Sequence, residues 1–93
     1  MSLQQKDSLE SFSACVGVKT VLYGALWSES FKEQQTLFKS STSLLTIVDC
    51  DAEPAVCNVA GVSKYPTWAI DGKQYGKLSL NELAEKTGCV LQN

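Results

Sequence analysis

The dipeptide Asp71-Gly72 limits the possible folds of this chain more than any other sequence feature. It stands between the strand-like residues 67–70 and the short segment 73–75. An Asp-Gly pair favours the two-residue turn of a β-hairpin, because both central positions of that turn take positive φ angles. The sequence therefore predicts one antiparallel pair of strands in the second half of the chain.

Two earlier segments are typical of strands buried inside a sheet. Residues 19–25 are rich in β-branched and aromatic side chains, and residues 44–48 form the longest apolar stretch. Between them a helix is expected, since Ser30 and Glu33 form a capping box and Ser28 is an alternative cap. A strand, a helix and a strand in this order favour a parallel pair joined by a right-handed crossover.

A further helix is expected before the first strand. Ser2 and Gln5 form a capping-box pattern, and apolar residues follow at helical spacing. Gly17 stands where such a helix would stop, which predicts a helix over residues 3–15.

Two shorter helices are expected later in the chain. Pro54 suits the first turn of one, and Gly61 suits its end. The residues expected to face the core from this helix are Val56, Val59 and Ala60. The other helix begins at a capping box formed by Ser79 and Glu82 and closes at Gly88.

These elements give the order α-β-α-β-α-β-β-α and an α/β fold class. The economical arrangement is a four-stranded mixed sheet flanked by helices. The 93 residues suit a single domain over residues 1–93, and 44% hydrophobic residues suffice for a core. We expect a soluble domain, because no apolar run is long enough to cross a membrane and the first ten residues are too polar for a signal peptide.

The charge and the missing histidine exclude several classes of function. A net charge of −2 provides no basic surface for a phosphate backbone, so no nucleic-acid partner is expected. Without histidine, the chain lacks the commonest general base and the commonest metal ligand. The cysteines at 15, 50, 57 and 89 allow three pairings and lack the close spacing of a zinc site, so no metal or cofactor is expected.

Two segments carry a resemblance to a known family. The strand end Tyr23-Gly24-Ala25-Leu26-Trp27, followed by a helix start, and the later Tyr65-Pro66-Thr67-Trp68 resemble the thioredoxin fold. More narrowly, they are similar to the thioredoxin-like domain fused to bacterial and plant homologues of vitamin K epoxide reductase. The resemblance covers about residues 7–89 and implies a cis peptide bond before Pro66.

The chain departs from this family at its redox motif. Where the family has Cys-x-x-Cys after the tryptophan, this sequence has Ser28-Glu29-Ser30-Phe31. Ser28 stands for the attacking cysteine and Phe31 for the resolving one. A hydroxyl is a far weaker acid than a thiol and cannot form the mixed disulfide through which exchange proceeds. We therefore predict a redox-degenerate domain with no catalytic residue at the usual site.

The resemblance also implies a disulfide between Cys50 and Cys57, because relatives carry a second cysteine pair in similar positions. Two interpretations stay open, a structural link or a redox-active pair in an exposed loop. Cys15 and Cys89, each at a helix end, are expected to be free thiols. An oxidised Cys50–Cys57 pair would favour an extracytoplasmic compartment, such as the periplasm or the thylakoid lumen.

What remains of a thioredoxin site without its cysteines is a peptide groove, here expected at Trp27, Ser28, Phe31, Tyr65 and Pro66. The residue before a cis-proline offers its backbone to an extended segment of a partner. The main hypothesis is therefore a domain that binds or positions a protein or an extended peptide. The alternative is a thiol-disulfide oxidoreductase that works through Cys50 and Cys57. A third hypothesis is an accessory domain of a longer membrane oxidoreductase.

Overall fold

Four strands form one mixed sheet in the computed structural model, which describes residues 2–91. The strands are β1 (Thr20–Gly24), β2 (Ile47–Asp49), β3 (Thr67–Ile70) and β4 (Lys73–Tyr75), in the spatial order β2-β1-β3-β4. β1 pairs with β2 in parallel and with β3 antiparallel, and β3 pairs antiparallel with β4. The φ angles of 52° at Asp71 and 78° at Gly72 give the predicted hairpin turn. The predicted fold class is confirmed.

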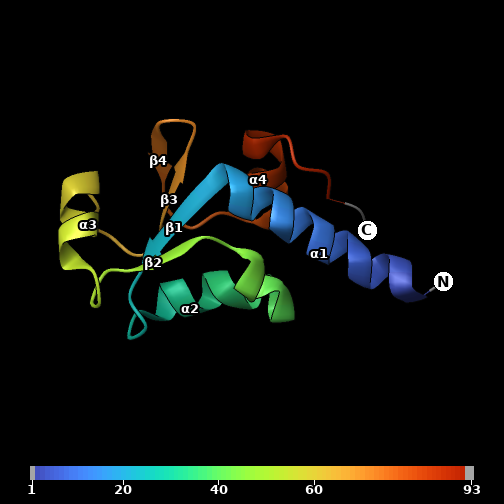
Figure 1. The fold of residues 1–93 in the computed structure, drawn as a ribbon, viewed down its shortest axis with the longest axis horizontal. Coiled ribbons are helices and arrows are strands. Elements are labelled where there is room, and N and C mark those ends of the chain that lie inside the picture. Colours follow the sequence, from blue (N-terminus) through green and yellow to red (C-terminus); the bar gives the residue numbers. More distant parts are fainter. Residues whose placement is uncertain (1, 92–93) are drawn as a thin grey trace.

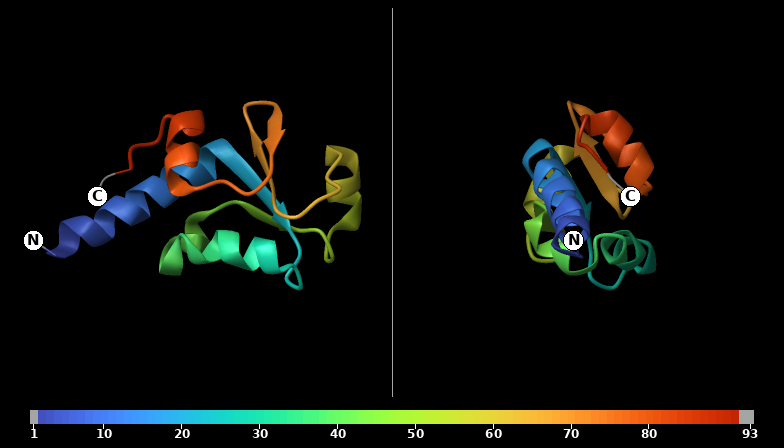
Figure 2. Two further views of the ribbon diagram at one scale, coloured as in Figure 1. Left: turned by 180° about the vertical axis from the view of Figure 1, so that it is seen from behind. Right: turned by 90° about the vertical axis from the view of Figure 1, so that its right-hand side faces the viewer.

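Helices flank this sheet along an elongated molecule, as Figures 1 and 2 show. They are α1 (Ser2–Lys19), α2 (Glu29–Thr36), the 3-10 helix η1 (Lys39–Leu44), α3 (Pro54–Ala60) and α4 (Leu80–Thr87). In Figure 1 and in the left view of Figure 2, α3 lies at the end of the molecule opposite to the N-terminal part of α1. The capping box expected at Ser2 and Gln5 involves side chains outside the described residues.

The predicted end of the first helix is wrong. α1 continues through Gly17 to Lys19, because this glycine serves close packing and not termination. A Cβ atom at Gly17 would lie 2.1 Å from the carbonyl oxygen of Leu44, so only glycine lets α1 approach the end of η1 this closely. Thr46 also bonds this glycine, with its hydroxyl donating to the Gly17 carbonyl at 2.6 Å.

The strand expected over residues 44–48 is shorter than predicted. β2 begins only at Ile47, since the preceding serine- and threonine-rich residues form η1. The Thr42 hydroxyl donates to the carbonyl oxygens of Gln35 and Lys39, at 2.9 and 2.8 Å. Short hydroxylated side chains satisfy local backbone groups in this way and so compete with a strand.

The cap residues fix the limits of the shorter helices. The capping box of Ser79 and Glu82 is present at α4, and the backbone N–H of Ser79, which donates to Glu82, holds the pKa of that carboxyl below its usual value. Pro54 begins α3 and Gly61 ends it with a φ of 76°, as predicted.

The predicted core face of α3 is wrong, however. Val56 and Val59 are 43% and 90% exposed, and Cys57 is the buried residue.

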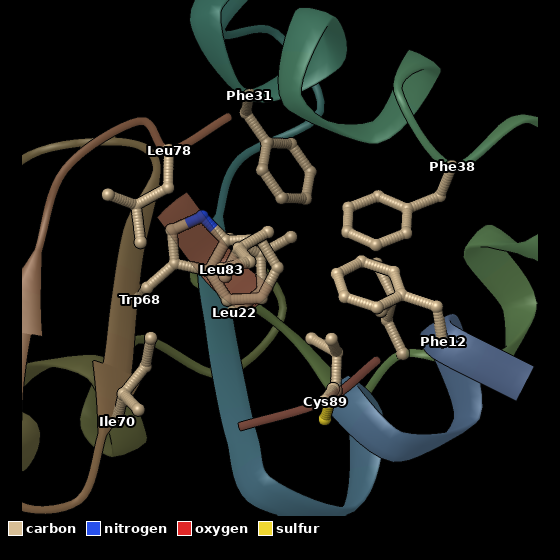
Figure 3. Packing of buried hydrophobic residues seen from close by; sticks show 11 residues of the cluster. Phe12, Leu22, Phe31, Phe38, Trp68, Ile70, Leu78, Leu83 and Cys89 are labelled. Carbon is tan, nitrogen blue, oxygen red and sulfur yellow. The ribbon is translucent and has the colours of Figure 1, made fainter. Parts of the chain in front are cut away.

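The core lies between α1, α2, α4 and the sheet. Figure 3 shows the side chains that build it: Phe12, Leu22, Phe31, Phe38, Trp68, Ile70, Leu78, Leu83 and Cys89. Phe38 contacts both Phe12 and Trp68, with ring centroids 6.4 and 6.1 Å apart. Aromatic contacts of this kind bury large apolar areas and hold α1 and the start of η1 against β3.

A buried glutamine connects α2 to the rest of the core. The Gln34 side chain accepts from Trp68 Nε1 at 2.9 Å and from the backbone N–H of Leu78 at 2.8 Å, and it donates to the Leu78 carbonyl at 2.7 Å. A fully buried amide with these partners costs little and fixes the orientation of the helix. No pattern in the sequence singles out this residue.

Cys15 and Cys89 form a disulfide, so the prediction that they are free thiols is wrong. Their Cα atoms lie 5.9 Å apart although 74 positions separate them in the sequence. This distance arises because α1 packs beside α4, whose end leads directly into Cys89. Only the tertiary arrangement reveals that pairing.

Candidate functional site

Three loops meet at one edge of the sheet. The parallel strands β1 and β2 end together, with Gly24 opposite Asp49, and the start of the antiparallel β3 lies beside them, with Thr67 opposite Tyr23. The loops that follow β1 and β2 and the loop that precedes β3 are therefore neighbours. We call this end of the sheet, with residues 25–28, 50–53 and 61–66, the loop edge. It also carries α3, which lies at the far end of the molecule from the N-terminus in Figure 1.

Ser28 occupies the junction between β1 and α2. Its backbone N–H donates to the Ala25 carbonyl at 3.0 Å, and its hydroxyl oxygen accepts from the N–H of Phe31 at 3.3 Å. The serine is therefore the N-cap of α2, so the predicted capping box at Ser30 and Glu33 is wrong and the alternative cap, Ser28, is the one observed. Its oxygen is a hydrogen-bond acceptor at the positive end of a helix, a position that would stabilise a thiolate if a cysteine stood there.

Phe31 does not line a groove. Its side chain is 1% exposed and belongs to the core cluster, so the prediction of an accessible groove residue is corrected. The ring lies against Gly24, where a Cβ atom would come within 2.0 Å of it. The aromatic side chain fills the space beneath the β1–α2 junction and leaves the exposed surface to other residues.

Trp27 and Tyr65 bring the β1–α2 loop and the loop before β3 into contact. Their ring centroids are 5.6 Å apart with an edge-to-face angle of 75°. The Trp27 side chain remains 66% exposed, and Leu26 beside it is also exposed. The Tyr65-Pro66 peptide bond is cis, and Pro66 is buried. The backbone of Tyr65 forms no hydrogen bond to any other described residue.

Cys50 and Cys57 form the second disulfide, which links the end of β2 to α3. Their Cα atoms are 5.6 Å apart, and each cysteine is only 4% exposed. The disulfide that the resemblance implies is therefore present, but its cysteines are largely buried and do not form the exposed loop pair of the redox-active interpretation. Thiol–disulfide exchange requires direct attack on a sulfur atom, and this burial restricts such attack.

A cavity of about 350 Å³ lies between α3 and Tyr65, and we call it the α3 cavity. It is lined by the Cys50–Cys57 disulfide, Pro54, Ala55, Asn58, Val62 and Tyr65. Sequence reasoning missed this cavity, because Ala55, Asn58 and Val62 carry no motif. Their common position depends on how the disulfide holds α3.

Three acidic residues lie at the end of β2 and in the segment that leads from it to α3. Asp51 and Glu53 are exposed, while Asp49 is half-buried and its Oδ1 accepts from the N–H groups of Asp51 and Ala52. Among the described side chains, those of residues 8–91, no salt bridge neutralises any of the three. The loop edge is therefore negatively charged.

Two further findings concern metal ligands and membrane-spanning helices. Among the described residues, no group of three histidine, cysteine or acidic side chains is placed to hold a metal ion. Over the same part of the chain, no helix has the length and apolar character needed to cross a membrane.

The architecture and the loop edge define a thioredoxin-like fold. The chain is similar to the oxidised glutaredoxin 2 from Chlamydomonas reinhardtii, with a TM-score of 0.50 and 17% sequence identity over 92% of this chain and 98% of that one. No protein-family model matches the sequence. The similarity establishes the fold, while the function is inferred from the residues at the loop edge.

Proposed function

We propose that this thioredoxin-like domain binds or positions a protein partner at its loop edge and does not exchange disulfides at the usual position. The observation that carries this proposal is Ser28 at the N-terminus of α2, directly after Trp27, whose ring contacts Tyr65. By the resemblance to the family, the position of Ser28 would hold the attacking cysteine of a redox site, and here it holds a hydroxyl. A hydroxyl cannot supply the thiolate or the mixed disulfide.

Partner binding is supported by what the loop edge exposes. Trp27 lies largely in solvent beside Tyr65, and large aromatic side chains often provide most of the binding energy of an interface. The unpaired backbone groups of Tyr65 could pair with an extended segment, in the manner of an added β-strand. These features favour a protein or peptide over a small molecule as the ligand.

The alternative function, exchange through Cys50 and Cys57, has less support. Both cysteines are almost fully buried, and the neighbouring acids Asp49 and Asp51 would disfavour a thiolate by charge repulsion. A rapid nucleophile normally sits in an exposed and electropositive environment, which this loop does not offer.

A redox assay separates the two functions. We expect the wild-type chain to show no turnover in insulin reduction or in oxidation of a dithiol peptide. The matched control is the double variant Cys50→Ala, Cys57→Ala, which should give the same background. Turnover by the wild type that this variant loses would establish the alternative, and turnover that Ser28→Ala abolishes would contradict the proposal at its centre.

We also propose an oxidising, extracytoplasmic compartment, since two disulfides persist only where thiols are not kept reduced. Alkylation of the chain in freshly lysed source cells should modify no cysteine until a reductant is added; rapid labelling of all four would contradict this.

A narrower proposal places the domain in a longer membrane oxidoreductase of the vitamin K epoxide reductase type. Transmembrane segments encoded in the same reading frame would support it, and a stop codon on both sides of the domain would refute it.

A further inference from the structure

The α3 cavity has the shape and lining of a site for a side chain. Its volume of about 350 Å³ lies at the lower end of the range of about 300–1,000 Å³ that small-molecule sites span. Asn58 and the Tyr65 hydroxyl are the polar side-chain groups among its lining residues, and the other lining residues are Pro54, Ala55, Val62 and the disulfide. The lining is therefore mixed: Pro54, Ala55 and Val62 offer contacts to an apolar side chain of a peptide, and the polar surface beside them suits the peptide's backbone groups.

The cavity continues into the exposed aromatic surface. Tyr65 belongs to the cavity lining and at the same time contacts Trp27. A segment that placed one side chain in the cavity would therefore pass along the Tyr65 backbone and cover the Trp27 ring. Tyr65 therefore joins the cavity to the Trp27 ring, and this continuity suits an extended chain.

The charge at the edge indicates the chemistry of the segment. Asp51 and Glu53 directly adjoin the lining residues Cys50 and Pro54 in sequence, and neither has a salt-bridge partner among the described residues. The nearby acids of α2 differ, since Glu29 pairs with Lys32 at 3.6 Å and Glu33 pairs with Lys77. Lys64 is the one basic residue in the loop that precedes β3. A partner with positive charge would complement this surface.

We propose that the surface formed by Trp27, Tyr65 and the α3 cavity binds an extended segment of a partner protein in which an apolar side chain stands beside lysine or arginine residues. The apolar side chain occupies the cavity, and the basic residues lie against Asp51 and Glu53. This inference rests on the proposed function, because it specifies the ligand of the same loop edge.

Binding of three short synthetic peptides to the full chain tests the inference. The peptides share one length and alternate lysine with leucine, glutamate with leucine, or lysine with serine. We expect the lysine–leucine peptide to bind about tenfold more tightly than either of the others, and more weakly as salt is raised. Amide chemical shifts should change in residues 26–28 and 50–65.

Variants assign the contacts. Trp27→Ala should weaken binding of the lysine–leucine peptide by about tenfold or more. Asp51→Asn with Glu53→Gln should weaken it several-fold and flatten its salt dependence. Val59→Ser is the matched control, because Val59 lies on α3 but outside the cavity lining, and it should bind like the wild type. Thermal unfolding of each variant shows that the fold is kept.

The other outcomes separate this inference from the proposed function. If the glutamate–leucine peptide bound equally well at the same residues, the loop edge would remain a binding site, but the proposed charge preference would be wrong. Shift changes confined to other residues, or no binding by any peptide, would overturn the inference even where the redox assay shows no turnover. A concentration-dependent dimer that Trp27→Ala abolishes would assign the surface to a second copy of the chain and also overturn it.

Discussion

The disulfides Cys15–Cys89 and Cys50–Cys57 span nearly equal Cα distances, 5.9 and 5.6 Å, but they lie in regions that are packed very differently. The first joins α1 to the residue that follows the C-cap of α4, and Cys89 belongs to the main core cluster. The second holds α3, where Cys57 alone among seven residues is buried. One bond therefore reinforces a region that hydrophobic packing already holds, and the other orders a helix that has little packing of its own.

The same contrast appears in the hydrogen bonds of the two regions. In the core, the Gln34 side chain joins α2 to β3 and to the segment before α4 through three bonds. At α3, one side-chain bond among the described residues reaches the helix from the sheet, from Gln74 Nε2 to the carbonyl of Ala60 at 2.7 Å. Regions with few buried contacts open locally at low free-energy cost, and binding surfaces are often drawn from them.

Removal of the long-range disulfide should have the largest effect. Cys15→Ala with Cys89→Ala opens a loop with a sequence separation of 74, for which the chain-entropy relation gives about 4.5 kcal/mol of lost stability. Chemical denaturation should show this loss as a lower midpoint of global unfolding. An unchanged midpoint would show that packing of α1 against α4 suffices without the bond.

Removal of the local disulfide should have a smaller effect of a different kind. For Cys50→Ala with Cys57→Ala, the separation of 7 gives about 2.5 kcal/mol by the same relation. Because α3 has few other contacts, we expect amide hydrogen exchange to accelerate chiefly in residues 51–62, with loss of peptide binding at the α3 cavity. Equal acceleration in α1 and α4 would contradict a separate role for this bond.

The smallest change in stability is expected for an unpaired polar group in the well-packed region. The Ser13 hydroxyl is fully buried in α1 and has no hydrogen-bond partner within the described residues. Ser13→Ala should therefore raise stability by about 1–2 kcal/mol, because it removes an unsatisfied polar group and adds helix propensity. The exposed Ser11 on the same helix provides the control, since Ser11→Ala should gain only about 0.5 kcal/mol from propensity. Equal gains in denaturant midpoint would show that burial of the hydroxyl costs nothing.

Several features of this site follow from local chemistry and could be predicted. A serine cannot act as a thiol, so the missing redox pair is visible in Ser28 and Phe31 without coordinates. The place of Phe31 could not be predicted in the same way. Its ring enters the core because Gly24 on the neighbouring strand leaves the necessary space, and that contact depends on the docking of α2.

The sequence by itself determined the hairpin turn and the limits of α3 and α4. Asp71-Gly72, the box of Ser79 and Glu82, and Pro54 act through backbone angles and bonds within a few residues, so they behave alike in any fold. The tertiary structure decided which cysteine meets Cys15, why Gly17 lies inside a helix, and where a cavity opens beside α3. Each of these depends on atoms that are distant in the chain, and only the packing of whole elements brings such atoms together.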